Sequence, residues 1–155
     1  MNSATRFIDN LVDRFVPDQV RGDINAYKRV RMFIISHLLG PFLGHPISIY
    51  LFANDPNPWP HVHLLAASIT MFWFFPIALR MFPGSYSWLA IASVANLNFA
   101  ILITSFHFGG ASSPFLMWFL ITPLLAFFYL GSGFRTSIAI FSQMVVGVGI
   151  FYGMY

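Results

Sequence analysis

The run MFIISHLLGPFLGHPISIYLF, residues 32–52, contains no Asp, Glu, Lys or Arg. A helix of about 20 apolar residues is long enough to cross the hydrocarbon core of a bilayer. Further apolar runs follow at residues 62–79, 85–106, 115–130 and 136–155. We therefore expect an all-α, polytopic membrane helix bundle over residues 31–155, with five spans joined by short connections rich in Pro and Gly.

The composition of the chain excludes an ordinary soluble domain. Hydrophobic residues make up 57% of the 155 residues and charged residues only 8%, which leaves too little polar surface to cover a soluble fold. Cysteine is absent, so the chain itself forms no disulfide and offers no thiolate ligand. Any bound metal would have to be held by histidine or by oxygen.

The positive charges predict how the bundle is oriented. Of the eight Lys and Arg residues, all but Arg80 and Arg135 precede the first apolar run. By the positive-inside rule, the N-terminus and the connections beside these two arginines face the cytoplasm, and the loops that contain Asp55 and Gly109 face outside. Residues 1–30 are then a cytoplasmic, amphipathic juxtamembrane segment. The net charge of +3 indicates contact with anionic lipids, not with nucleic acid.

Five spans from a cytoplasmic start would place Tyr155 outside, so we expect a sixth span beyond this sequence. The spacing Gly149-x-x-x-Gly153 offers a slim face against which another helix can pack. The sequence shows no nucleotide-binding loop, paired metal-binding carboxylates or phosphoacceptor segment. We therefore expect any enzymatic activity to belong to a domain that lies outside this chain.

Five histidines, His37, His45, His61, His63 and His107, lie in or beside the apolar runs. Ionisable groups are costly in hydrocarbon and tend to mark function there, and neutral imidazole is a common ligand of haem iron. His45 is expected in the outer half of the first run and the other three, His61, His63 and His107, near the outer boundary, so these four could converge on a buried cofactor. His37 lies about 12 Å deeper than His45. Alternatively, the histidines are interfacial residues or hydrogen-bond across helices.

Small and polar residues near these histidines predict a lined cavity with room for a flat ligand. They are Gly44 in the first run, Ala67 and Thr70 in the second, and Ser93, Asn96, Ala100 and Thr104 in the third. The last four recur every three or four residues, as the residues on one face of a helix do. Their hydroxyl and amide groups could orient the imidazoles.

The turn that follows the third run offers a second set of polar groups. Gly109 and Gly110 could bring backbone N–H groups toward a quinone carbonyl or a haem propionate, and Ser112 and Ser113 could add hydroxyl donors. The same residues are equally well explained as a tight turn leading into the next helix, with Pro114 at its first position.

Three stretches of the chain resemble a known family. They are LGPFLGHP (residues 39–46), FHFGGASSPF (residues 106–115), and Trp118 with PLLAFF (residues 123–128). They are similar to the six-helix membrane anchors of bacterial class III adenylate cyclases and related sensor histidine kinases, and the resemblance covers nearly the whole chain. The histidine-bearing version is similar to the anchors that bind two haem b groups and respond to quinone.

The resemblance implies a site and a function. His45 and His107 would be the first axial ligands of haem b, His63 the next, and His37 the fourth in preference to His61. One or two haems would exchange electrons with quinone in the bacterial inner membrane. The anchor would regulate a cytoplasmic effector, first of all an adenylate cyclase, as a homodimer. The alternative is the receptor domain of a sensor histidine kinase that binds a small lipophilic signal without haem.

Overall fold

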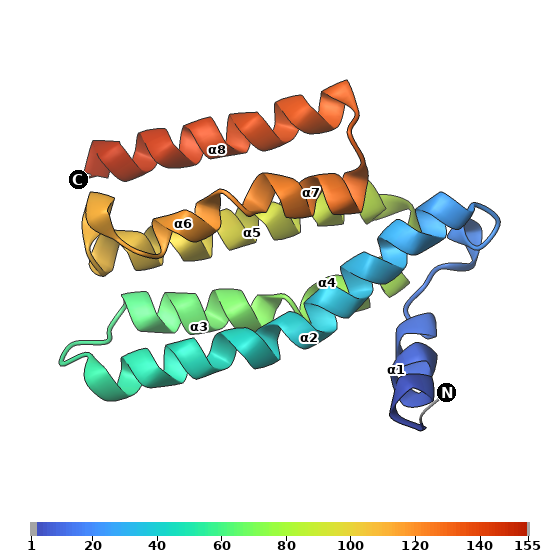
Figure 1. Cartoon of the computed structure of the whole chain (residues 1–155), viewed down its shortest axis with the longest axis horizontal. Coiled ribbons are helices and arrows are strands. Elements are labelled where there is room, and N and C mark those ends of the chain that lie inside the picture. Colours follow the sequence, from blue (N-terminus) through green and yellow to red (C-terminus); the bar gives the residue numbers. More distant parts are fainter. Residues whose placement is uncertain (1–2, 155) are drawn as a thin grey trace.

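The computed structural model describes residues 3–154, and the side chains of residue 6 and of residues 9–154. The secondary structure of this part of the chain is entirely helical. Its elements are α1 (Ser3–Asp13), η1 (Asp18–Val20), α2 (Ile24–Asn54), α3 (His61–Met71), α4 (Phe74–Met81), η2 (Pro83–Ser85), α5 (Tyr86–His107), η3 (Gly110–Ser112), α6 (Leu116–Phe119), α7 (Thr122–Leu130) and α8 (Phe134–Met154). Figure 1 shows α2 to α8 lying roughly along one common axis, with α1 turned across one end.

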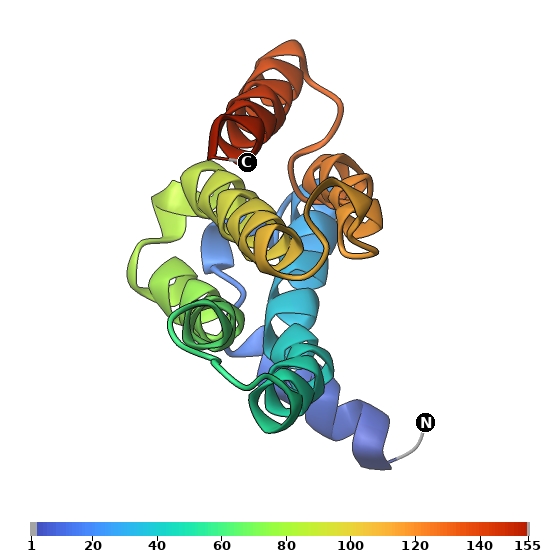
Figure 2. The ribbon, with the colours of Figure 1, turned by 90° about the vertical axis from the view of Figure 1, so that its left-hand side faces the viewer.

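Successive segments of the bundle alternate in direction, so their connections gather at two ends. The α2–α3 connection and the last residues of α5 and α8 lie at one end, here called the Asp55 end (Figure 1). The opposite end, here called the α1 end, holds α1, the start of α5 and the α7–α8 connection. α5 lies at the centre, where it contacts α3, α6, α7 and α8 (Figure 2).

Several helices are long and apolar enough to cross a membrane. α2, the segment Pro83–His107 and α8 each pass this test alone, and α3 with α4 passes it as a pair bent by 41°. The segment Leu116–Leu130 is a shorter apolar helix. The chain is therefore an all-helical protein with three or four helices that could span a membrane, which supports a lipid bilayer as its environment. Five spans and a cytoplasmic N-terminus stay predictions.

Two of the expected spans are broken, and a proline lies in the first turn after each break, whereas α2 continues through Pro41 and Pro46. The run 62–79 is divided between α3 and α4, and Pro76 lies in the first turn of α4. The run 115–130 is divided between α6 and α7, and Pro123 lies at the start of α7. A proline lacks the N–H that a helix interior needs, but the first turn of a helix does not use it. The helix therefore restarts just before each proline.

α2 begins well before its apolar run. Asp23 caps it, since the Asp23 carboxylate accepts hydrogen bonds from the backbone N–H groups of Asn25 at 2.8 Å and Ala26 at 3.3 Å. A short polar side chain at this position satisfies N–H groups that have no partner within the helix. The expected boundary at residue 30, between a surface segment and the bundle, thus falls inside a continuous helix.

The amphipathic segment at the α1 end packs against α2. Val12 and Val16 are buried, Asp9 forms an ion pair with Arg31, and the Tyr27 hydroxyl donates to the Asp13 carboxylate at 3.1 Å. Apolar and polar contacts together therefore attach the segment to the first helix of the bundle.

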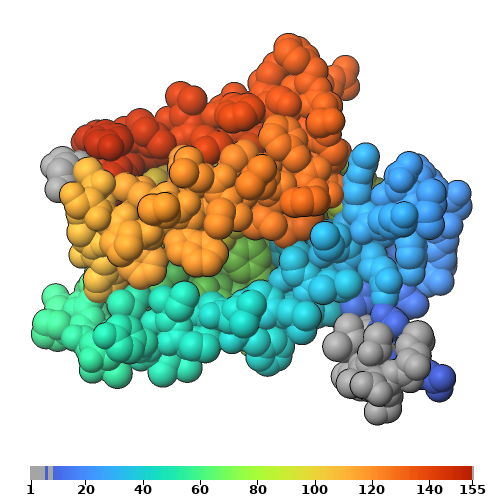
Figure 3. Space-filling view, in the orientation of Figure 1, coloured from blue at the N-terminus to red at the C-terminus, as the bar shows by residue number. Residues whose placement is uncertain are grey.

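Most of the buried core lies toward the α1 end. Phe33, Ile34, Leu79 and Ile140 are all fully buried there, in one cluster. A smaller cluster around Val62 supports the Asp55 end. α8 lies along one edge of the bundle (Figure 3), and only 11% of its apolar stretch is buried. Most of the α8 surface is therefore available to lipid or to another helix.

The turn between α7 and α8 depends on a glycine. Gly131 has a φ of +77°, and a Cβ at this position would lie 2.9 Å from the guanidinium carbon of Arg29. The positive φ strains any other residue here, and a side chain would also require the guanidinium group of Arg29 to shift. Arg29 thereby links the start of α2 to the α7–α8 turn.

Candidate functional site

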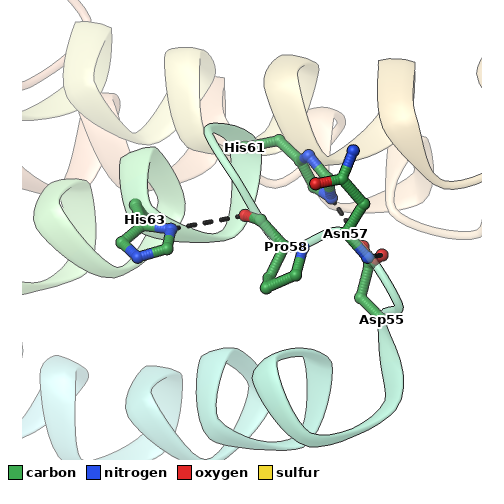
Figure 4. A network of polar contacts seen from close by, with 5 residues as sticks. All are labelled: Asp55, Asn57, Pro58, His61 and His63. Atoms are coloured by element: carbon green, nitrogen blue, oxygen red, sulfur yellow. Dashed lines mark hydrogen bonds and ion pairs between the residues drawn. The ribbon is translucent and has the colours of Figure 1, made fainter.

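The connection between α2 and α3 carries an ion pair at the Asp55 end. One carboxylate oxygen of Asp55 accepts from the backbone N–H of Asn57 at 2.9 Å, and the other pairs with Nε2 of His61 at 2.6 Å (Figure 4). Two hydrogen bonds lower the pKa of the Asp55 carboxyl below its ordinary value. The one from the N–H of Asn57 has the larger effect, and the one from His61 the next largest. Both contacts favour the charged form of the carboxylate.

A second histidine reaches this ion pair from α5. The rings of His61 and His107 stack with their centroids 4.2 Å apart and their planes 17° from parallel, and Phe108 packs edge-on against His61 at 5.3 Å. We call Asp55, His61 and His107 the Asp55 cluster. It combines one carboxylate and two imidazoles: Asp55 and His61 lie at the two ends of the α2–α3 connection, and His107 is the last residue of α5.

The other two histidines expected near this depth lie apart from the Asp55 cluster. Figure 4 shows His63 turned away from Asp55; its Nδ1 lies 3.4 Å from the carbonyl of Pro58, and its exposed ring packs against Phe52 and Trp59. Nε2 of His45 lies 3.4 Å from the Thr70 hydroxyl. The structure thus brings His61 and His107 together but does not bring His45 and His63 to them.

His37 is buried in the main core, 2% exposed. Its Nδ1 lies 2.6 Å from the carbonyl oxygen of Phe33, while its Nε2 is buried and has no hydrogen-bond partner. An Nδ1–H that donates to a backbone carbonyl leaves the lone pair on Nε2, which is the arrangement found in metal-bound histidines. The ring is surrounded by the side chains of Phe33, Phe72, Phe75 and Tyr129.

These positions allow a test of whether the histidines fit haem b. Two axial imidazoles must point their nitrogens at the iron from opposite sides, whereas the rings of His61 and His107 stack face to face. Among the residues that the structure describes, no group of three or more histidine or carboxylate side chains could hold a metal ion. The four expected ligands, His37, His45, His63 and His107, lie at separate places in the fold, and their ligation of haem stays a prediction. His37 differs from the other histidines in that its unpartnered nitrogen is buried, while its other nitrogen is held by a backbone carbonyl at 2.6 Å.

The expected cavity lining is used largely for helix packing. Asn96 exchanges hydrogen bonds with Ser68 of α3: its amide oxygen accepts from the Ser68 hydroxyl and its amide nitrogen donates to the Ser68 carbonyl, both at 2.9 Å. The hydroxyls of Ser93 and Thr104 bond to carbonyls of their own helix. The side chain of Ile69 fills the space beside Gly44, where a Cβ would lie 3.0 Å from it.

The remaining lining residues do not close a pocket either. The Thr70 hydroxyl donates to the Ala66 carbonyl at 2.8 Å, and Ala67 is exposed on the surface of α3. Ala100 is buried in the small cluster at the Asp55 end. These residues therefore serve the contact between α3 and α5 or face outward.

The turn after α5 requires its glycines. Gly109 and Gly110 have φ values of +104° and +56°, a region that L side chains rarely adopt. The N–H groups of Ser112 and Ser113 donate to the carbonyls of Gly109 and Gly110, and the Ser113 hydroxyl accepts from the N–H of Phe115. These bonds build a tight turn, and contact of the glycine N–H groups with quinone or haem stays a prediction.

Sequence reasoning did not single out two groups of polar residues. The first is Asp55 as the partner of His61, for which the signal was a carboxylate and an imidazole at the two ends of one short Pro-rich loop. The second is Asn98 of α5 with Gln143 of α8. The Asn98 amide is buried with no partner for its oxygen or its nitrogen, and the Gln143 amide oxygen has none either. The sequence signal for this second group was the presence of an amide side chain, Asn98 or Gln143, in the middle of an apolar run.

Comparison of this chain with models of known protein families, with curated proteins and with solved structures gives no match.

Proposed function

We propose that this chain is the membrane-embedded sensory module of a signalling protein, and that the signal is redox. In this proposal the chain binds haem b, exchanges electrons with quinone in the bacterial inner membrane, and regulates a cytoplasmic effector such as an adenylate cyclase. The N-terminus and the α1 end face the cytoplasm, as the positive charges predict. The resemblance of the histidine-bearing stretches to dihaem anchors motivates the proposal.

The structural observation that carries the proposal is the buried Nε2 of His37. A polar atom buried without a partner costs free energy unless something else satisfies it, and a haem iron would do so. The carbonyl of Phe33 fixes the orientation of the ring by accepting from Nδ1. The aromatic side chains around His37 exclude water. Because His37 has a held nitrogen and a buried, unpartnered one, we propose it as a single protein ligand to the iron in place of a pair of histidines.

The position of His37 also offers a route to the effector. Its aromatic neighbours Phe75 and Tyr129 belong to the main core cluster, which also includes Val12 and Val16 beside α1. A bound haem supplies one-electron redox chemistry, so its charge would change next to this cluster. Packed side chains respond to such a change by shifting between discrete arrangements. The attachment of α1 to α2 would then carry the change toward a cytoplasmic domain.

The experiment is the haem content of purified His37→Ala compared with that of His63→Ala. The first substitution removes the proposed ligand; the second removes an exposed histidine and serves as the matched control. We expect the His37 variant to lose nearly all of its haem, measured by pyridine haemochrome assay, and the control to keep it. Equal haem content in both folded variants would remove His37 from the site.

A second candidate function is a receptor for a small lipophilic signal that binds without haem. The observation that favours it is a groove of about 300 Å³ between α5 and α8, in which the unpartnered amide of Asn98 lies among apolar side chains. A visible absorption spectrum distinguishes this function from a haem-based one, because a haem-free receptor is colourless.

A further inference from the structure

A groove between α5 and α8 combines an apolar wall with unsatisfied polar groups. Its volume is about 300 Å³, and its lining includes Asn98, Leu102 and Phe106 from α5 and Gln143, Val146 and Ile150 from α8. This volume lies at the lower end of the range for small-molecule sites, which are largely apolar with a few placed polar groups. Among the residues that the structure describes, no Asp, Glu, Lys, Arg or His lines the groove, so its surroundings favour a neutral ligand.

The amide of Asn98 is the polar centre of the groove. The residue is only 4% exposed, and within the described residues 3–154 neither its Oδ1 nor its Nδ2 has a hydrogen-bond partner. Gln143 donates through Nε2 to the carbonyl of Ile91 at 3.4 Å, which leaves its Oε1 without a partner. Asn98 therefore offers one acceptor and one donor side by side, and Gln143 adds a second acceptor.

The depth of Asn98 makes these unsatisfied groups unusual. At 1.5 Å of rise per residue, Asn98 lies about 14 Å from the His107 end of α5, inside the stretch that could span a membrane. Water is scarce at that depth, so a buried amide without a partner is costly. Polar side chains in such positions tend to serve function.

We propose that this groove binds a small, neutral, lipid-soluble molecule that carries a hydroxyl group on an apolar body. The hydroxyl would donate to Oδ1 of Asn98 and accept from Nδ2, while the apolar body lies against Leu102, Val146 and Ile150. Entry requires a lining side chain to move, and Phe99 lies on the lipid-facing side of the groove, 46% exposed. This inference rests on the second candidate function, the receptor for a small lipophilic signal, and does not depend on haem bound at His37.

A second transmembrane helix is the competing occupant, and the burial of Asn98 argues against it. Val146 and Ile150, at the rim of the groove, are 59% and 57% exposed, so a packing helix would meet them first. Its own side chains would then hold its backbone away from an amide that is only 4% exposed. A narrow molecule can reach the amide where a helix cannot.

The test is photolabelling of the full chain in lipid nanodiscs with two probes. One is a fatty alcohol with a diazirine on its alkyl chain, and the other is the same alkyl diazirine without the hydroxyl. We expect the alcohol to label peptides of α5 and α8 at the groove, and unlabelled alcohol to compete. Asn98→Leu should lower this labelling about tenfold, as expected for the loss of hydrogen bonds in a dry site, and should not lower labelling by the hydroxyl-free probe.

Two further variants complete the test. Val146→Trp fills the groove, leaves Asn98 in place and should abolish labelling by the alcohol. Ser142→Leu changes an exposed residue of α8 that does not line the groove, and labelling should be unchanged. The proposal is overturned if the two probes label the groove equally and Asn98→Leu changes neither. It is also overturned if the parent chain can be cross-linked as a dimer and Asn98→Leu abolishes this cross-linking. That result would identify a second copy of the chain as the occupant.

Discussion

Asn96 and Ser68 allow a test of whether the polar face of α5 serves helix packing or lines a cavity. At the end of α3 the backbone N–H of Phe72 donates to Ile69, three residues back, at 3.2 Å. The Ser68 carbonyl, four residues back, instead accepts from the Asn96 amide at 2.9 Å. Asn96→Leu removes this bond and the 2.9 Å bond from the Ser68 hydroxyl. Interhelical hydrogen bonds in membrane proteins contribute about 0.6 kcal/mol each, up to about 1.7 kcal/mol.

Two such bonds, with the Ser68 carbonyl left without its side-chain donor, predict a loss of about 1 to 3 kcal/mol in the free energy of unfolding. Asn98→Leu is the matched control, because it makes the same change two residues further along α5 but removes an amide that has no partner. We expect the control to be neutral or slightly stabilising. Unfolding in mixed micelles, followed by circular dichroism across an SDS titration, measures both variants. If Asn96→Leu is no more destabilising than Asn98→Leu, the packing role of Asn96 is refuted.

Three further predictions concern the turns and the orientation. Gly131→Ala should lower the free energy of unfolding by about 1 to 3 kcal/mol, because a φ of +77° with a ψ of 172° is a conformation that only glycine adopts readily, whereas Gly133→Ala, with only an ordinary contact at 3.7 Å, should change it little in the same SDS titration. The folded state lowers the pKa of Asp55 from its ordinary 3.8, so it binds fewer protons than the unfolded chain. The stability that this contributes is present above pH 3.8 and is lost as the pH falls through the lowered value; thermal melts of Asp55→Asn should lack this loss. Reporter fusions should place Gly110 outside and Ser132 in the cytoplasm, and the reverse pattern would overturn the orientation.

The helices could be predicted from the sequence because apolar runs of membrane length have few alternatives in a bilayer. Two of these runs divide just before Pro76 and Pro123, but the run that contains Pro41 and Pro46 does not divide. What hydropathy did not indicate was that Pro76 and Pro123 would each begin a new helix and that α2 would extend back to the Asp23 cap. The boundary at residue 30 was placed near the point where the charged residues end. It missed the Asp23 cap because a cap depends on a single side chain, whereas hydropathy is an average over many residues.

The histidine site was harder to predict, because depth along a helix does not determine the direction in which a side chain points. His61 and His63 share a depth, but residues two apart on a helix point to nearly opposite sides. His61 therefore faces α5, where it meets His107, while His63 faces outward. The pairing of Asn98 with Gln143 in one groove depends on how α5 and α8 pack, which no local pattern specifies.

The most direct test of the proposed function is the visible spectrum of the purified chain, oxidised and then reduced with dithionite. The account predicts a b-type haem signal at about one haem per chain, with the high-spin character expected of a single protein ligand, and reoxidation of the reduced form by a soluble quinone analogue. A low-spin spectrum would contradict the assignment of His37 as the single protein ligand. A folded, colourless chain that stays colourless after expression with added haem precursor would contradict the haem-based function itself.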